Sequence, residues 1–170
     1  MRLIDADILS YALFDESPAH LDSWKIIENA VRTQIRLYVA MTSILETYNV
    51  LYWFYRVRPR TALIQKISRV LETMIPIPPS SNGIDLAFRE NIPLGDGFLL
   101  ATALNNRIPV IVSNDVHIAK IAPKIGLIVE NPLAEKTKRR LSHPKSREVE
   151  SGSTWLEKRD YNHPRVNRVS

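Results

Sequence analysis

The stretch IPVIVSND at residues 108–115 decides the fold class, because it is the clearest strand of the chain and ends in a carboxylate. Its apolar residues follow one another almost without a break, which is typical of a strand buried on both faces of a parallel sheet. The helical pattern VHIAKIAPK follows directly. Strand, acid and helix in this order predict one βα unit with Asp115 at the junction.

The same order of strand and helix recurs along the chain. RLIDA precedes the helical DILSYALF, and RLYVAM precedes TSILETYNVLYWFYR. Further helices are predicted at 21–31, 60–74, 84–91 and 97–107, the proline-rich IPIPPSSNG at 75–83 is a connection or a short edge strand, and GLIVENP is a final short strand. This alternation predicts a mostly parallel sheet covered on both faces, in a three-layer α/β/α domain, although the order of the strands cannot be predicted.

Composition narrows the classes of protein. The chain has 170 residues, 45% of them apolar and 24% charged, which suits one globular domain. There is no cysteine, so disulfides, thiolate zinc sites and a catalytic thiol are excluded. No apolar run reaches the roughly 20 residues that span a bilayer, and acids interrupt the first nine residues where a signal peptide is apolar. We expect a cytoplasmic protein.

Four acids lie at equivalent places in the predicted βα units. Asp5, Glu46, Asp96 and Asp115 each end a strand or stand in the first turn of the next helix. Sites of parallel α/β sheets form outside the carboxyl ends of the strands, so these acids can converge. Converging carboxylates repel one another and recruit a cation, and an oxygen-only ligand set favours Mg²⁺ or Mn²⁺. Such an ion lowers the pKa of a bound water.

Three of the acids also have a purely structural explanation. Glu46 stands three residues after Ser43, in the spacing of a capping box. Asp96 can simply complement a helix dipole or cap the first turn of its helix. Asp115 can cap the helix after its strand, a role open to Asn114 or Ser113 as well. For these residues, shared placement and order favour a functional role more than any single position does.

The remaining candidates differ in strength. Asp5 lies within the apolar LID, where an unpaired charge is costly, so a ligand or a paired carboxylate is favoured. Asp7 is predicted to cap the first helix and at most to support the site from behind the ligands. His117 has no spaced partner and is interpreted as a surface or packing residue. A set of aromatic residues at helical spacing is assigned to the core or a dimer surface rather than to base stacking: Trp24, Tyr48, Tyr52, Trp53 and Tyr55.

LIDADIL, TSILETYNVL, IPLGDGFLLATAL and VIVSNDVHIAKI, in this order, resemble the PIN domain, and most closely the VapC-type toxin ribonucleases. The resemblance covers residues 1–132. It implies a Rossmann-like three-layer domain that cleaves RNA endonucleolytically with Mg²⁺ or Mn²⁺ and commonly forms dimers. The family's catalytic and metal-binding acids fall on Asp5, Glu46, Asp96 and Asp115.

The resemblance also implies supporting positions and shows departures. Asp7, Ser43 and Asn114 would support the ligands rather than bind metal. The family often has a small hydroxyl and an amide after the first acid, whereas this chain has Ala6 and Asp7. Members usually end near Pro132, so we predict a nuclease domain over 1–132 and a basic, partly disordered tail over 133–170.

The tail holds all the net charge of the chain. Residues 1–133 contain 13 Lys/Arg and 13 Asp/Glu, whereas residues 134–170 contain 10 and 5, which accounts for the net charge of +5. Such a tail neutralises RNA phosphates or merely keeps the protein in solution, and both interpretations stay open.

Several functions remain open. If the chain is a nuclease, it is expected to be either a toxin paired with an antitoxin or an RNA-processing or ribosome-maturation nuclease. A haloacid-dehalogenase-like magnesium phosphatase would use the D-x-D of Asp5 and Asp7, but that chemistry wants an acid shortly after Asp96, where Leu99 and Leu100 stand. A non-catalytic RNA- or protein-binding module is the last alternative, and the presence of all four acids disfavours it.

Overall fold

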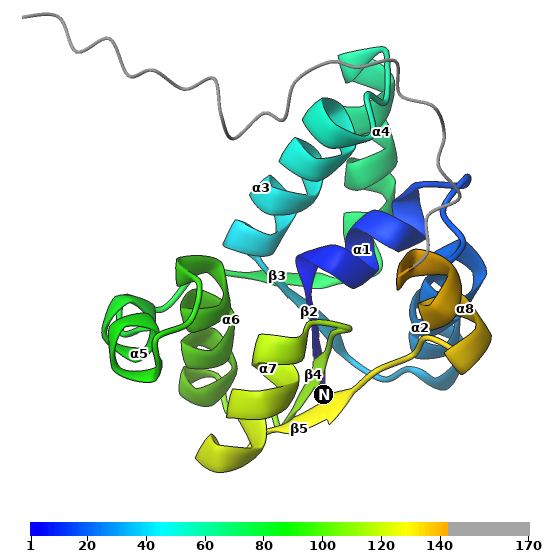
Figure 1. The fold of residues 1–170 in the computed structure, drawn as a ribbon. Helices are drawn as coiled ribbons and strands as arrows, with labels where there is room; N and C mark the ends of the chain where they lie inside the picture. Colours follow the sequence, from blue (N-terminus) through cyan, green and yellow to red (C-terminus); the bar gives the residue numbers. More distant parts are fainter. Residues whose placement is uncertain (143–170) are drawn as a thin grey trace, which may run out of the picture.

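A sheet of five parallel strands forms the centre of the chain in the computed structural model, which describes residues 1–142 (Figure 1). The strand order is β3-β2-β1-β4-β5, and Ile4 of the central β1 pairs with Val39 on one side and Val112 on the other. The parallel sheet and the three-layer arrangement confirm the predicted fold class. The strands are β1 (Arg2–Ile4), β2 (Leu37–Ala40), β3 (Ile75–Ile77), β4 (Val110–Val112) and β5 (Ile128–Glu130).

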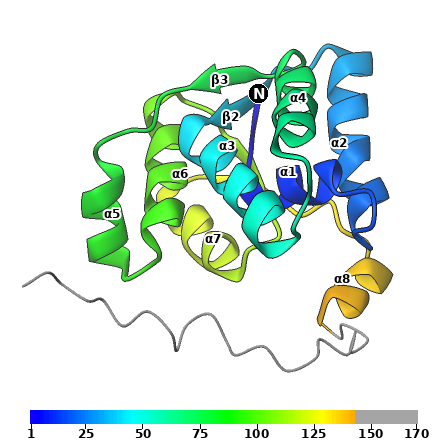
Figure 2. The same cartoon turned by 90° about the horizontal axis from the view of Figure 1, so that it is seen from above.

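Helices cover both faces of the sheet (Figure 2). One face packs against α1 (Ala6–Leu13), α2 (His20–Thr33) and α4 (Arg60–Leu71). The other packs against α5 (Gly83–Glu90), α6 (Leu94–Asn105) and α7 (Val116–Ile121). The remaining helical elements are α3 (Met41–Asn49), its π-helical continuation η1 (Val50–Phe54), the 3-10 turn η2 (Ala122–Ile125) and α8 (Glu135–Ser142).

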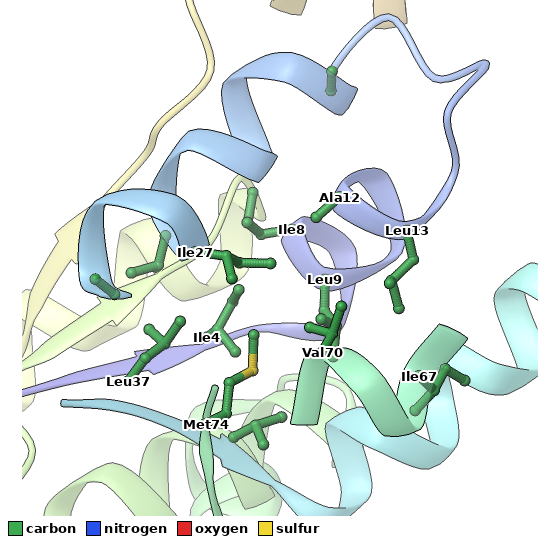
Figure 3. Packing of buried hydrophobic residues seen from close by; sticks show 14 of the residues in the cluster. Ile4, Ile8, Leu9, Ala12, Leu13, Ile27, Leu37, Ile67, Val70 and Met74 are labelled. Atoms are coloured by element: carbon green, nitrogen blue, oxygen red, sulfur yellow. The ribbon is translucent and has the colours of Figure 1, made fainter. Parts of the chain in front are cut away.

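Two apolar clusters hold the layers together, because successive residues of a strand point to opposite faces. In β1, Ile4 joins the cluster under α1 and α2 (Figure 3), whereas Leu3 joins the cluster under α6 and α7. In β4, Val112 and Ile111 divide in the same way. Both faces of each central strand are therefore buried, which explains their uninterrupted apolar sequences.

Glycines allow α5 and α6 to pack backbone to backbone. A Cβ built on Gly97 would lie 2.4 Å from the carbonyl oxygen of Gly83, and one built on Gly83 would lie 2.6 Å from Cα of Phe98. Neither position has room for a side chain. The close contact fixes α6, which carries Asp96 in its first turn.

The proline-rich segment and the start of the basic tail both take part in the fold. IPIPPSSNG contains the edge strand β3, where Pro76 is tolerated because an edge strand has no neighbour on its outer side. After β5, Leu133 is buried in the core, and the side chain of Asp22 accepts hydrogen bonds from Ala134 N (3.0 Å) and Thr137 Oγ1 (2.6 Å). The start of the basic tail therefore packs on α2. The boundary at 132 stays a prediction, and the predicted disorder beyond Ser142 lies outside the described residues.

Among residues 1–142, the helices are too short or too polar to cross a membrane.

Candidate active site

The strand order creates one edge at which the predicted site residues can meet. From β1 the chain adds β2 and β3 on one side and later places β4 and β5 on the other, so the order reverses between β1 and β4. The crevice at such a reversal is the usual site of open parallel sheets. Asp5 follows β1 and Asp115 follows β4, while Glu46 lies on α3 and Asp96 on α6.

Asp5 joins the start of α1 to the end of β4. Its Oδ1 accepts the Ala6 N–H (2.6 Å), and Asp5, not the predicted Asp7, is the N-cap of α1. Its Oδ2 accepts a hydrogen bond from Ser113 Oγ (2.7 Å), which in turn accepts the Asp115 N–H (3.0 Å). One buried hydroxyl thus connects two of the predicted acids. Its signal in the sequence is a serine between the apolar strand and Asn-Asp, which was interpreted as an alternative helix cap and not as part of the site.

Asp7 fastens the loop that follows β4. Its Oδ2 accepts the Asn114 N–H (2.9 Å), and its Oδ1 accepts the Ile8 N–H (2.5 Å). The Asn114 side chain points elsewhere, because its Oδ1 accepts a hydrogen bond from Asn131 Nδ2 (3.0 Å) beyond β5. Backbone and side chain of Asn114 are therefore both held, one by α1 and the other by the segment after the last strand.

Asp115 is the N-cap of α7, as its capping interpretation predicted. Its Oδ1 accepts the backbone N–H groups of His117 (2.5 Å) and Ile118 (3.2 Å). Within residues 1–142, no hydrogen bond engages its Oδ2. Capping by one oxygen leaves the other free for a ligand, so the two roles are compatible.

Asp96 has the clearest unsatisfied group of the site. It lies in the first turn of α6 without capping that helix, and its Oδ2 is buried with no hydrogen-bond partner in the described part of the chain. Burial raises its pKa to about 6, and the charges of Asp115 and Glu46 add to this rise while His117 opposes it. A buried carboxylate oxygen without a donor is costly unless a cation or a proton meets it.

Glu46 faces Asp96 from α3. A Cβ built on Gly95 would lie 3.5 Å from Glu46 Oε2, so this carboxylate lies beside the start of α6. The capping-box explanation is wrong, because α3 begins at Met41 with Ala40 as its N-cap, and Ser43 is buried inside the helix. Burial raises the pKa of Glu46, and the charge of Asp115 adds to this rise.

The two acids of α1 are the most strongly perturbed. Burial raises the pKa of Asp5 well above its usual range, and the charge of Asp7 adds to the effect. Burial raises the pKa of Asp7 to about 7, against the hydrogen bonds from Asn114 and Ile8, with further contributions from Asp115 and Glu46. Five carboxylates from four separate elements therefore sense one another's charge at one edge of the sheet.

These residues fit a divalent cation in their chemistry but not as a preformed cage. Hard cations prefer carboxylate oxygens, and the buried Oδ2 of Asp96 lacks any other partner. No three histidines or acids within residues 1–142 are positioned to hold a metal ion together. The side chains would have to rotate inward for several of them to bind one ion.

An α/β domain with five parallel strands and carboxylates beyond the carboxyl ends of β1 and β4 defines the structural class. The PIN domain model matches residues 2–124, and the chain belongs to this family, whose members are nucleases. No curated protein matches the chain.

Solved structures share the fold at low sequence identity. PAE2754 from Pyrobaculum aerophilum is 19% identical with a TM-score of 0.54, over 84% of this chain and 90% of that one. VapBC2 from Rickettsia felis, bound to a DNA fragment from its promoter, is 15% identical with a TM-score of 0.58, over 76% and 97%. A toxin-antitoxin complex from Klebsiella pneumoniae is 18% identical with a TM-score of 0.55, over 78% and 98%.

Proposed function

We propose that the chain is a divalent-metal-dependent endoribonuclease, with Mg²⁺ or Mn²⁺ held by Asp5, Glu46, Asp96 and Asp115. The observation that carries this proposal is the buried, unpartnered Oδ2 of Asp96 beside Glu46, at the carboxyl edge of a PIN-family sheet. A cation would satisfy this oxygen and offset both the burial and the mutual repulsion that raise the pKa values of Asp5, Glu46 and Asp96.

The residues divide the work. Asp96 on α6 and Glu46 on α3 would hold the ion, and Asp115 would add the oxygen that its capping role does not use. Asp5 is held by Ser113, and Asp7 positions the loop that carries Asp115. When bound, the cation supplies an activated water and stabilises the charge that develops on the scissile phosphate.

The phosphatase alternative is disfavoured by the contacts of Asp7. It would need this carboxylate as an acid/base toward a substrate, whereas both Asp7 oxygens accept backbone N–H groups within the fold. A non-catalytic binding module would not explain why the buried Oδ2 of Asp96 has no hydrogen-bond partner in the described part of the chain.

Partners belong to the same proposal. The structures from Rickettsia felis and Klebsiella pneumoniae are a VapBC pair and a toxin-antitoxin complex, so we extend the proposal to a toxin neutralised by an antitoxin. An RNA-processing or ribosome-maturation nuclease is the alternative on the same site. A homodimer, an RNA substrate and a cytoplasmic location stay predictions from the sequence.

The test compares purified wild-type protein with Asp96→Asn on single-stranded and structured RNA, each with Mn²⁺, Mg²⁺ or a chelator. Wild-type protein should cleave only with the cation, and the variant should lose at least two orders of magnitude in rate. Asp85→Asn, on the exposed first turn of α5, is the matched control and should cleave normally. Equal cleavage by wild type and Asp96→Asn would refute the assignment.

A further inference from the structure

The segment from α3 to α4 concentrates positive charge. Residues 47–71 contain Arg56, Arg58, Arg60, Lys66 and Arg69 and no acid, although residues 1–133 as a whole are neutral. The other residues of 1–133 are therefore net negative, by five charges. We call Arg56, Arg58 and Arg60, which lie between η1 and the first turn of α4, the arginine turn.

The charges of the arginine turn are exposed and uncompensated. All three side chains are exposed, and within residues 1–142 none of them forms an ion pair, whereas Lys66 binds Asp15 (2.8 Å). Natural surfaces usually intersperse charges of both signs, and a patch of one sign attracts a ligand of the opposite sign.

Two of the guanidinium groups are fixed on an aromatic ring. Arg58 lies 3.6 Å and Arg60 lies 4.8 Å from the centroid of Tyr52. Arg58 Nη1 donates to the carbonyl oxygens of Tyr52 (2.6 Å) and Val57 (3.0 Å), and Arg60 Nη2 donates to Tyr52 Oη (3.2 Å). A guanidinium has five N–H donors, so these bonds orient each group and leave donors for a phosphate.

Exposed aromatic rings stand beside these charges. Trp53 is 59% exposed and packs edge-on against Tyr52, with ring centroids 4.7 Å apart. Phe54 is 76% exposed and packs edge-on against Tyr55 at 5.0 Å. Trp53 was predicted to belong to the core or a dimer surface, yet in the single chain its ring is exposed next to fixed positive charge. This combination is typical of surfaces that bind single-stranded nucleic acid.

The helical stretch of α3 and η1 connects the acidic site to the arginine turn. Glu46 lies on α3 and Arg56 follows η1, about 15 Å further along at the rise of a helix, and Figure 1 shows α3 running from beside α6 toward α4. Next to this helical stretch, Tyr55 stacks on Phe14, the residue that ends α1, with ring centroids 4.4 Å apart. Burial raises the pKa of Tyr11 to about 12, and the contributions of Asp7 and then Tyr55 to this rise indicate that Tyr11 lies near both.

We infer that the arginine turn, with Trp53, binds the part of a single-stranded RNA that flanks the scissile phosphate, through guanidinium contacts to phosphates and stacking of a base. This inference rests on the proposed ribonuclease function and extends it to the substrate path. Attachment to positive charge about 15 Å along the helix from Glu46 offsets the repulsion of the RNA by the carboxylates and directs the strand toward them.

The test measures binding of a fluorescent, single-stranded mixed-sequence RNA over a range of salt concentrations. Asp96→Asn full-length protein with Mn²⁺ is the background, which separates binding from cleavage. Arg56→Gln/Arg58→Gln/Arg60→Gln should weaken binding by on the order of tenfold at low salt and reduce the slope of log K against log salt by about 2.

A control with the same change of charge is available at the amino ends of the strands, on the side opposite the acids. Arg36, Arg107 and Lys124 are exposed and precede β2, β4 and β5, and their triple change to Gln should leave the slope nearly unaltered. Since Arg58 also binds backbone carbonyls, the single Arg56→Gln provides a variant with less risk to folding and should reduce the slope by about 0.7. Melting curves check that each variant folds.

The outcomes separate the two proposals. Equal RNA affinity and slope for the arginine-turn variants and the control would overturn the inference, while cleavage by wild-type protein would leave the proposed function intact. Absence of cation-dependent cleavage by the wild type refutes the function itself. Titration with fluorescent oligoglutamate forms a second arm. If the arginine-turn variant loses only oligoglutamate binding, the surface binds an acidic protein segment, which also overturns the inference.

Discussion

Asp5 and Ser113, 108 positions apart in the chain, share a hydrogen bond of 2.7 Å between carboxylate and hydroxyl. This bond stabilises the charged form of Asp5 against a burial that raises its pKa. It also places the Asp115 N–H, because the same hydroxyl accepts it. The serine is thus the physical connection between the ends of β1 and β4.

Replacement of Ser113 by alanine should therefore remove one hydrogen bond from the Asp5 carboxylate and one from the backbone of Asp115. The expected cost in the free energy of unfolding is about 1–3 kcal/mol, because a buried N–H and a buried carboxylate lose a partner. The rise in melting temperature on adding Mn²⁺ should shrink in parallel, since the more readily protonated Asp5 binds a cation less well. Ser113→Thr, which keeps the hydroxyl, is the control and should retain the Mn²⁺ response; identical responses of Ala and Thr variants would contradict the role.

Asp7 should make the metal-free protein less stable as the pH rises. Its folded-state pKa of about 7 exceeds the ordinary value of 3.8, so the folded state holds the proton more tightly than the unfolded state does. Stability is then lost between about pH 4 and pH 7. Asp7→Asn cannot ionise. It gives up one of the two backbone hydrogen bonds of Asp7 at every pH, but in EDTA its stability relative to wild type should rise by on the order of 1 kcal/mol between about pH 4.5 and pH 8.

Denaturant titrations at pH 4.5 and pH 8, taken as about the two ends of this window, measure the difference. The stability of Asp7→Asn relative to wild type should be higher at the higher pH than at the lower. Asp85→Asn, on the exposed face of α5, should show no pH-dependent advantage. A variant equally stable relative to wild type at both pH values would contradict the assignment of strain to the Asp7 charge.

Gly97→Ala should disrupt the contact between α5 and α6. Its new Cβ would meet the Gly83 carbonyl oxygen at 2.4 Å, so the helices must separate, at a cost of about 1–3 kcal/mol or more. Gly95→Ala, two residues earlier in α6, meets only Glu46 Oε2 at an ordinary 3.5 Å and should leave stability unchanged or slightly raised. Thermal melting compares the two, and equal melting temperatures would show that the helices do not need the glycine.

The end of the folded unit can be located by truncation. A protein ending at Ser142 keeps the buried Leu133 and the hydrogen bonds of Asp22, and should melt like the full chain. A protein ending at Pro132 loses them and should be destabilised by about 2–4 kcal/mol, chiefly through the missing core leucine. Equal melting of both would confirm the predicted boundary at 132 as the end of the stable domain.

The fold was predictable because periodicity and burial depend on local sequence. The apolar runs in VIVSND and RLIDA predicted buried parallel strands, and in the structure both lie inside the sheet, as β4 and β1. The strand order was not predictable, because all five strands are short and apolar and no local pattern states which neighbours pair. The packing of α8 was missed for a related reason: its charged sequence hides the single buried Thr137.

The site was predictable in its carboxylates but not in its connections. Placement after strands singled out Asp5 and Asp115. Which acid caps α1 depends on where the helix begins, and in the structure Asp5, not Asp7, is the N-cap. Ser113 gave little signal, since a serine before Asn-Asp also suits a plain turn. The roles of the four acids as ligands stay a prediction.

The placement of β4 beside β1 has a consequence for synthesis. β1 leaves the ribosome first, but its neighbour on the β4 side and the partner of Asp5 are made more than a hundred residues later. Contacts of such long range form late, because a long loop must close before they can be made. The nascent chain therefore lacks its assembled cluster of acids until nearly the whole domain has emerged, and a protein proposed to cut RNA would be inactive while most of its own messenger is read.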